Sequence, residues 1–231
     1  MNILTDSLAS AVLMVFSFEK ELADIVLVSV TVSGASTLIA SLAGIPAGFF
    51  IAFESFKGKR IIITILNTLL ALPTVVIGLV VYAMISRRGP MGSLGLLYTK
   101  KAMVMGQVIL IFPLVTTFVM AAVSRIDKRY RKTAMTLGAG RARTALAVLK
   151  EARFGIVAAV VAAYGRVISE VGVSMMLGGN ARGFTRTMTT AMALEYNKGS
   201  FSLAVALGIV LLSISFGINL LFHFFQGRAE S

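Results

Sequence analysis

The residues of this 231-residue chain that could carry chemistry are few. There is no cysteine, so thiolate chemistry, disulfides and cysteine-ligated metal are excluded. The one histidine, His223, has no second metal ligand near it in the sequence. The sequence also shows no paired carboxylates, no nucleophile–base set and no metal-ligand cluster. It therefore predicts no enzyme activity and no cofactor bound by this chain.

A phosphate-binding loop is missing as well. Such a loop needs a glycine, four further residues, Gly-Lys and then Ser or Thr, so that backbone N–H groups and the lysine surround the phosphates. Gly58-Lys59 is the only Gly-Lys pair, Arg60 follows it, and Phe53 stands where the first glycine belongs. The chain is therefore not expected to bind ATP in this way, and energy must come from a partner.

The clearest ionisable pair within an apolar run is Arg166 and Glu170. Four residues apart, they lie on one face of a helix. Charges at membrane depth are costly, so they pair with each other or border a water-filled cavity. Two interpretations remain open. The pair forms a salt bridge that fixes helix packing, or its face borders a translocation path with Ser169, Gly172 and Ser174.

Composition indicates that the elements positioning these residues lie in a membrane. Hydrophobic residues make up 57% of the chain and charged residues 14%, and the mean hydropathy is +0.89. A soluble domain keeps roughly a quarter of its positions charged. The net charge of +12 does not indicate a nucleic-acid partner, because Lys and Arg cluster between apolar runs and little polar surface remains. We predict an all-α transmembrane bundle.

Five apolar runs are each long enough to cross ~30 Å of hydrocarbon. They cover about residues 25–53, 61–86, 102–124, 156–177 and 201–225. We assign residues 20–227 to one transmembrane domain, residues 1–19 to an amphipathic helix at the interface, and residues 228–231 to a tail.

Prolines and glycines interrupt the first three runs. Gly44, Pro46 and Gly48 are expected to kink the first, and Pro73 and Pro113 to interrupt the second and third. In a membrane, a broken helix is tolerated only where protein or water satisfies the freed backbone groups. Pro73 and Pro113 therefore mark either a simple bend or part of a pore lining.

Basic clusters predict the orientation. Residues 57–60 and 125–153 are rich in Lys and Arg, which stay preferentially in the cytoplasm, so the N-terminus is expected outside and the C-terminus inside. The opposite side is basic too. Its charges would attract an anion, contact an acidic docking surface or contact lipid head groups. They are Arg87, Arg88, Lys100, Lys101, Arg182 and Arg186.

The loop at residues 125–155 is longer than a helix connection needs. Helix formers flank Gly138 and Gly140, which predicts a helix, a glycine turn and a second helix. Such a unit either docks into a groove of another protein or caps the bundle.

This loop resembles the coupling loop of the permease subunits of ATP-binding-cassette importers. Gly138, Ala139 and Val148 keep the family pattern, whereas Lys132-Thr133 replaces Glu-Ala and Lys150-Glu151 replaces Leu-Pro. The resemblance implies that a short stretch docks onto the ATPase. It consists of Lys132, Thr133, Ala134, Met135, Thr136, Leu137, Gly138, Ala139, Gly140 and Arg141.

Three other segments resemble the oxyanion permeases of this family. Residues 72–78 (LPTVVIG) and 165–172 (GRVISEVG) are similar to molybdate, tungstate and sulfate permeases, and residues 176–199 are most similar to tungstate permeases. The resemblance implies a homodimeric type I importer fold with a path or gate. The gate residues would be Pro73, Thr74, Arg166, Ser169, Glu170, Gly172 and Ser174.

The resemblance also implies the partners. They are a second copy of the chain, a cytoplasmic ATPase dimer, an extracytoplasmic oxyanion-binding protein and the lipid of a prokaryotic inner membrane. Tungstate is the expected substrate, followed by molybdate or sulfate. A stand-alone secondary transporter or channel would show more buried carboxylates than Glu170. A membrane assembly protein that transports nothing is the other alternative.

Overall fold

The computed structural model of the chain describes residue 13 and residues 20–227, and over that part it contains helices and no strand. The predicted interfacial helix at 1–19 and the tail at 228–231 lie almost entirely outside it. The elements are α2 (Lys20–Phe53), α3 (Lys59–Leu70), α4 (Thr74–Ile85), η1 (Gly92–Leu94), α5 (Lys100–Ser124), α6 (Lys128–Thr136), α7 (Arg141–Glu151), α8 (Arg153–Ile168), α9 (Gly172–Gly178), α10 (Met188–Lys198) and α11 (Phe201–Gly227).

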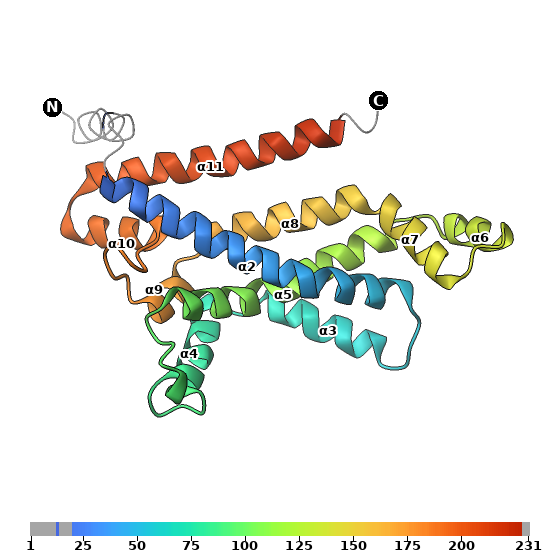
Figure 1. Ribbon diagram of the computed structural model, residues 1–231, viewed down its shortest axis with the longest axis horizontal. Coiled ribbons are helices and arrows are strands. Elements are labelled where there is room, and N and C mark those ends of the chain that lie inside the picture. The colour runs from blue at the N-terminus through green and yellow to red at the C-terminus, as the bar shows by residue number, and fades with distance from the viewer. Residues whose placement is uncertain (1–12, 14–19, 228–231) are drawn as a thin grey trace.

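The helices form an elongated bundle (Figure 1). Three of them, α2, α5 and α11, are long and apolar enough to cross a membrane, and the number rises to five if each of two bent helix pairs is one span. The prediction of an all-α bundle is confirmed. Apolar side chains also cover the outside of the bundle, as in Leu42 of α2 and Leu212 and Phe216 of α11, which suits contact with lipid.

The contact between α2 and α5 forms the centre of the bundle. A Cβ at Gly48 would lie 2.4 Å from the carbonyl oxygen of Thr116, and one at Gly44 would lie 2.9 Å from Val115 Cγ1. Small residues spaced four apart let membrane helices approach closely. The two glycines, expected with Pro46 to kink the first run, therefore act as contact residues. The helix α2 continues through this region with Pro46 inside it.

The second apolar run is two helices rather than one. Between α3 and α4 the chain bends by 99° at Pro73, because proline disfavours helical backbone in the residue before it. In the fourth run, α8 and α9 are bent by 58° around residues 169–171. Pro113, by contrast, lies inside the unbroken helix α5, so the expected interruption there is wrong.

Candidate functional site

The two helix breaks lie against each other in the bundle. A Cβ at Gly172, the first residue of α9, would lie 2.8 Å from Thr74 Oγ1 and 3.4 Å from Val75 Cγ2. Only a glycine leaves room for the start of α4 at this distance. Sequence positions almost a hundred residues apart, Pro73-Thr74 and Glu170–Gly172, thus form one junction. Discontinuous helices that meet inside a bundle are typical of transporter binding sites.

Glu170 holds this junction together. Its side chain is 3% exposed, and its Oε2 accepts a hydrogen bond of 2.6 Å from Arg166 Nη1. Its Oε1 accepts a hydrogen bond from the N–H of Val173 in the first turn of α9, at 3.3 Å. Its backbone carbonyl accepts a bond of 2.8 Å from Thr189 Oγ1 on α10. The carboxylate therefore has a positioning role, and the ion pair, one of the two interpretations of the sequence, is present.

Arg166 keeps hydrogen-bonding capacity beyond this pair. Its side chain is 41% exposed, and a guanidinium has five N–H donors, of which one contacts Glu170. Ser169 is exposed beside it and donates to the carbonyl oxygens of Gly165 and Arg166. The junction therefore presents a cation and a hydroxyl at its surface, which is chemistry suited to an anion.

Ser174 has a different environment from the other predicted path residues. It is fully buried, and its Oγ accepts a hydrogen bond of 3.1 Å from Gln107 Nε2 on α5. Gln107 Oε1 in turn accepts a bond of 2.8 Å from Ser36 Oγ on α2. This buried chain joins α2, α5 and α9. Sequence reasoning missed Gln107, although a glutamine within an apolar run was a visible signal.

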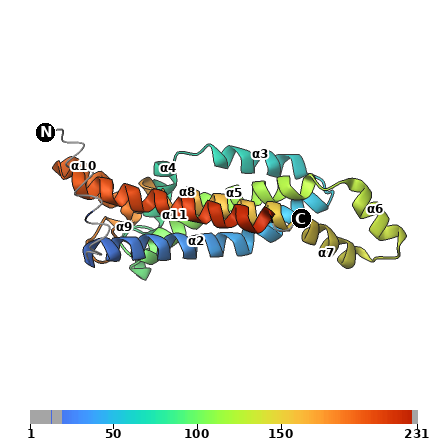
Figure 2. The same cartoon turned by 90° about the horizontal axis from the view of Figure 1, so that it is seen from above.

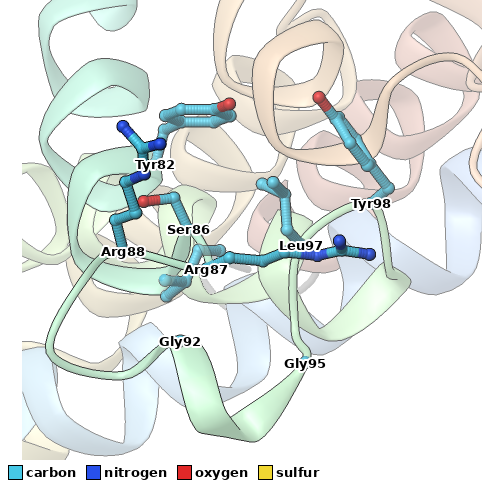
Figure 3. Close-up of a pocket in the computed structure, with 9 residues that line it drawn as sticks. Tyr82, Ser86, Arg87, Arg88, Gly92, Gly95, Leu97 and Tyr98 are labelled. Carbon is cyan, nitrogen blue, oxygen red and sulfur yellow. The ribbon is translucent and has the colours of Figure 1, made fainter.

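The end of α4 carries a pocket of about 610 Å³ (Figure 3). Arg87 and Arg88 line it together with the phenol side chains of Tyr82 and Tyr98. Both arginines are exposed and make no ion pair within the described residues. Their position supports the expectation of a basic surface that attracts anions.

The other predicted arginines on this side are paired. Arg182 and Arg186 contact the Glu21 carboxylate at 2.5 and 3.6 Å. One acidic residue at the start of α2 therefore forms ion pairs with two arginines of the loop before α10. Arg186 is only 13% exposed. These two residues contribute less free positive charge than the sequence suggests.

The predicted helix–glycine–helix unit is confirmed as α6 and α7. Asp127 begins α6 by accepting the N–H of Arg129 at 2.8 Å. Gly138 has φ +79°, the left-handed conformation that ends a helix, and the following N–H of Ala139 donates to the carbonyl oxygen of Ala134 at 3.0 Å. A Cβ at Gly138 would meet nothing within 4 Å, so backbone conformation alone requires a glycine here.

The unit projects beyond one end of the bundle, opposite α10, as Figure 2 shows. The unit exposes apolar side chains: Leu137 is 82% and Met135 55% exposed near the turn, and Leu146 in α7 is 64% exposed. Exposed apolar groups on a projecting unit indicate a surface for another protein. The geometry therefore favours docking over capping of the bundle.

An all-α bundle of apolar helices with two adjacent breaks is the architecture of a multi-pass membrane transport component. The family model for the binding-protein-dependent transport system inner membrane component matches residues 44–231. The chain belongs to this family of type I ATP-binding-cassette importer permeases, which are multi-pass proteins of the inner membrane.

Similarity to individual relatives extends over nearly the whole chain. It is 36% identical to the tungstate uptake system permease protein TupB of Peptoclostridium acidaminophilum, over 98% of this chain and 99% of that protein. It is 37% identical to TupB of Campylobacter jejuni, over 94% and 91%. Identity to the molybdenum transport system permease protein ModB of Escherichia coli is 29%, over 82% and 87%. Both TupB proteins are thus more similar to this chain than ModB is.

Proposed function

We propose that this chain is the permease subunit of an ATP-driven importer of an oxyanion, and that the oxyanion is tungstate. The junction of two broken helices, with the half-exposed Arg166 at its surface, is the observation that carries the proposal. The identity to the two TupB proteins is greater than the identity to ModB, which supports tungstate as the substrate. This chain binds no cofactor of its own, and ATP and magnesium belong to a partner.

The working unit in this proposal is a homodimer. The bend at Pro73 turns α4 away from the long axis of the bundle (Figure 1). It leaves Val75, Val76, Leu79 and Val80 at least 41% exposed. A twofold partner would cover this apolar face and enclose a path between the two junctions.

The ATPase dimer docks on the cytoplasmic tip formed by residues 132–141. Two observations support this position: the tip projects from the bundle, and its apolar side chains are uncovered. The basic segments 57–60 and 125–153 then lie in the cytoplasm, with the N-terminus outside and the C-terminus inside. The ion pair between Glu54 and Arg141, at 3.0 Å, supports placing both segments at one end.

A substrate-binding protein delivers the oxyanion at the opposite end. The pocket lined by Arg87 and Arg88 supports an anion-attracting surface there (Figure 3). Closure of the ATPase dimer moves the docked tips and switches the two permeases between outward-open and inward-open states. Each state is stabilised by the contacts that the partners make in that state alone.

Arg166 provides the test. In proteoliposomes containing the whole transporter, Arg166→Gln should lower tungstate uptake roughly tenfold or more, equivalent to about 1.4 kcal/mol of lost interaction. Arg166→Lys should retain an intermediate rate, because it keeps a charge beside Glu170. Arg60→Gln is the control, because it removes an exposed arginine of α3 that lies away from the junction and whose side chain makes no ion pair within the described residues. Normal uptake by well-folded Arg166→Gln and Glu170→Gln variants would contradict a path at this junction.

A further inference from the structure

Cations from other segments hold the C-terminal end of α2. The last carbonyl groups of a helix lack intrahelical donors and carry partial negative charge. No basic residue lies in the last turn of α2. Instead, Lys59 Nζ donates to the carbonyl oxygens of Ala52 and Glu54, at 3.3 and 3.1 Å, and Arg131 Nη1 donates to that of Phe53 at 2.9 Å.

Arg131 makes a second contact with the same residue. Its guanidinium carbon lies 4.2 Å from the centre of the Phe53 ring, and that ring stacks on Phe49 at 5.2 Å. A planar guanidinium can stack and donate at the same time, which an ammonium group does less well. We call Lys59, Arg131 and the three carbonyl groups the α2 clasp.

The α2 clasp connects the parts of the molecule that have to move together. Arg131 lies in α6, next to residues 132–141, which are proposed to bind the ATPase and are called the docking tip below. Lys59 begins α3, whose far end leads through Pro73 to the junction of the broken helices. A cavity of about 500 Å³ beside the clasp, lined among others by Phe53, Lys59 and Arg131, leaves space for α6 to shift.

We propose, on the basis of the proposed function, that Arg131 and Lys59 are positioning residues that transmit movement of the docking tip to α2 and α3. The ion pair between Arg141 and Glu54 is a weaker link between the same parts. Its arginine is 78% exposed, and exposed pairs contribute little. Without the α2 clasp, α6 and α7 still bind the ATPase, but their movement no longer reaches the helix breaks.

The first test needs no partner. Because the chain has no cysteine, spin labels can be attached at Ser55→Cys and Thr133→Cys, both exposed positions. Arg131→Gln should broaden the distance distribution between the labels. Arg129→Gln removes the same charge from the same helix and should leave the distribution unchanged, since the Arg129 side chain makes no hydrogen bond or ion pair within the described residues. Equal distributions in the two variants would overturn the proposal.

The second test uses the assembled transporter. In Arg131→Gln and Lys59→Met, the ATPase should still co-purify and keep its basal hydrolysis, while stimulation by the substrate-loaded binding protein falls about fivefold or more. Arg131→Lys should recover part of the stimulation, and Lys57→Met, at an exposed position two residues before Lys59, should keep all of it. Stimulation that survives Arg131→Gln, or loss of ATPase binding in that variant, would overturn the proposal.

The two tests separate the two hypotheses. If the wild-type chain bound no ATPase, the proposed function would fail, while the labelled chain would still report whether Arg131 holds α6 to α2.

Discussion

Glu170 shows how a single residue determines the geometry of the junction. Its carboxylate contacts Arg166 in α8 and the N–H of Val173 in α9, and its backbone carbonyl contacts Thr189 in α10. The spacing in the sequence placed Arg166 and Glu170 on one helix face and left an ion pair as one of two interpretations, because residues four apart on a helix face each other. It could not predict the contact with Thr189, which depends on how the chain returns after α9.

Gly138 allows a residue-scale prediction with a matched control. A side chain at φ +79° costs roughly 1–2 kcal/mol, except for residues such as Asn that visit this conformation more readily. Gly138→Val should therefore weaken binding of the ATPase, and Gly138→Asn should weaken it less. Gly140, at φ −66°, adopts a conformation open to any residue, so Gly140→Ala should weaken binding less than Gly138→Val does.

Quantitative co-purification with the ATPase measures these differences. Neither glycine has an atom within 4 Å of an added Cβ, so steric collision inside the chain does not distinguish the two sites. Equal effects of Gly138→Val and Gly140→Ala would contradict a role for the left-handed turn.

At the scale of elements, hydropathy located the helices but not all of the breaks. The five apolar runs coincide with α2, α3–α4, α5, α8–α9 and α11. Pro73 was a visible signal for the first break. The second, before Gly172, contains no proline and arises from tertiary contacts with Thr74 and Thr189. The short helix α10 was also missed, although Thr187 and Thr190 form a capping box at its start.

The close approach of α2 and α5 can be tested at two glycines of one helix. Gly48→Ala places a Cβ against the carbonyl oxygen of Thr116 and should lower the free energy of unfolding by about 1–3 kcal/mol, the usual cost of overpacking. Gly34, also in α2, has nothing within 4 Å of an added Cβ, so Gly34→Ala should be neutral or slightly stabilising. Thermal unfolding of the purified chain in detergent measures both, and a larger loss at Gly34 would contradict the packing described here.

At the scale of the whole molecule, the functional parts lie at separate places along one bundle. The docking tip of α6 and α7 lies at one end, the helix junction lies within the bundle, and the arginine-lined pocket lies at the end of α4 (Figures 1 and 3). Charge clustering predicted that residues 57–60 and 125–153 share one side, and the contacts of Lys59, Arg131 and Arg141 with the end of α2 place them together. The exposed apolar face of α4 could not be predicted from hydropathy, because hydropathy does not report the 99° bend that uncovers it.

Tungstate uptake into proteoliposomes tests the central claim most directly. The vesicles contain this chain with its ATPase, the binding protein is added outside, and ATP is enclosed. We expect uptake only when all three proteins and ATP are present, and tungstate should outcompete molybdate and sulfate. Uptake by this chain without the ATPase, or no uptake by the complete and correctly assembled set, would contradict an ATP-driven permease.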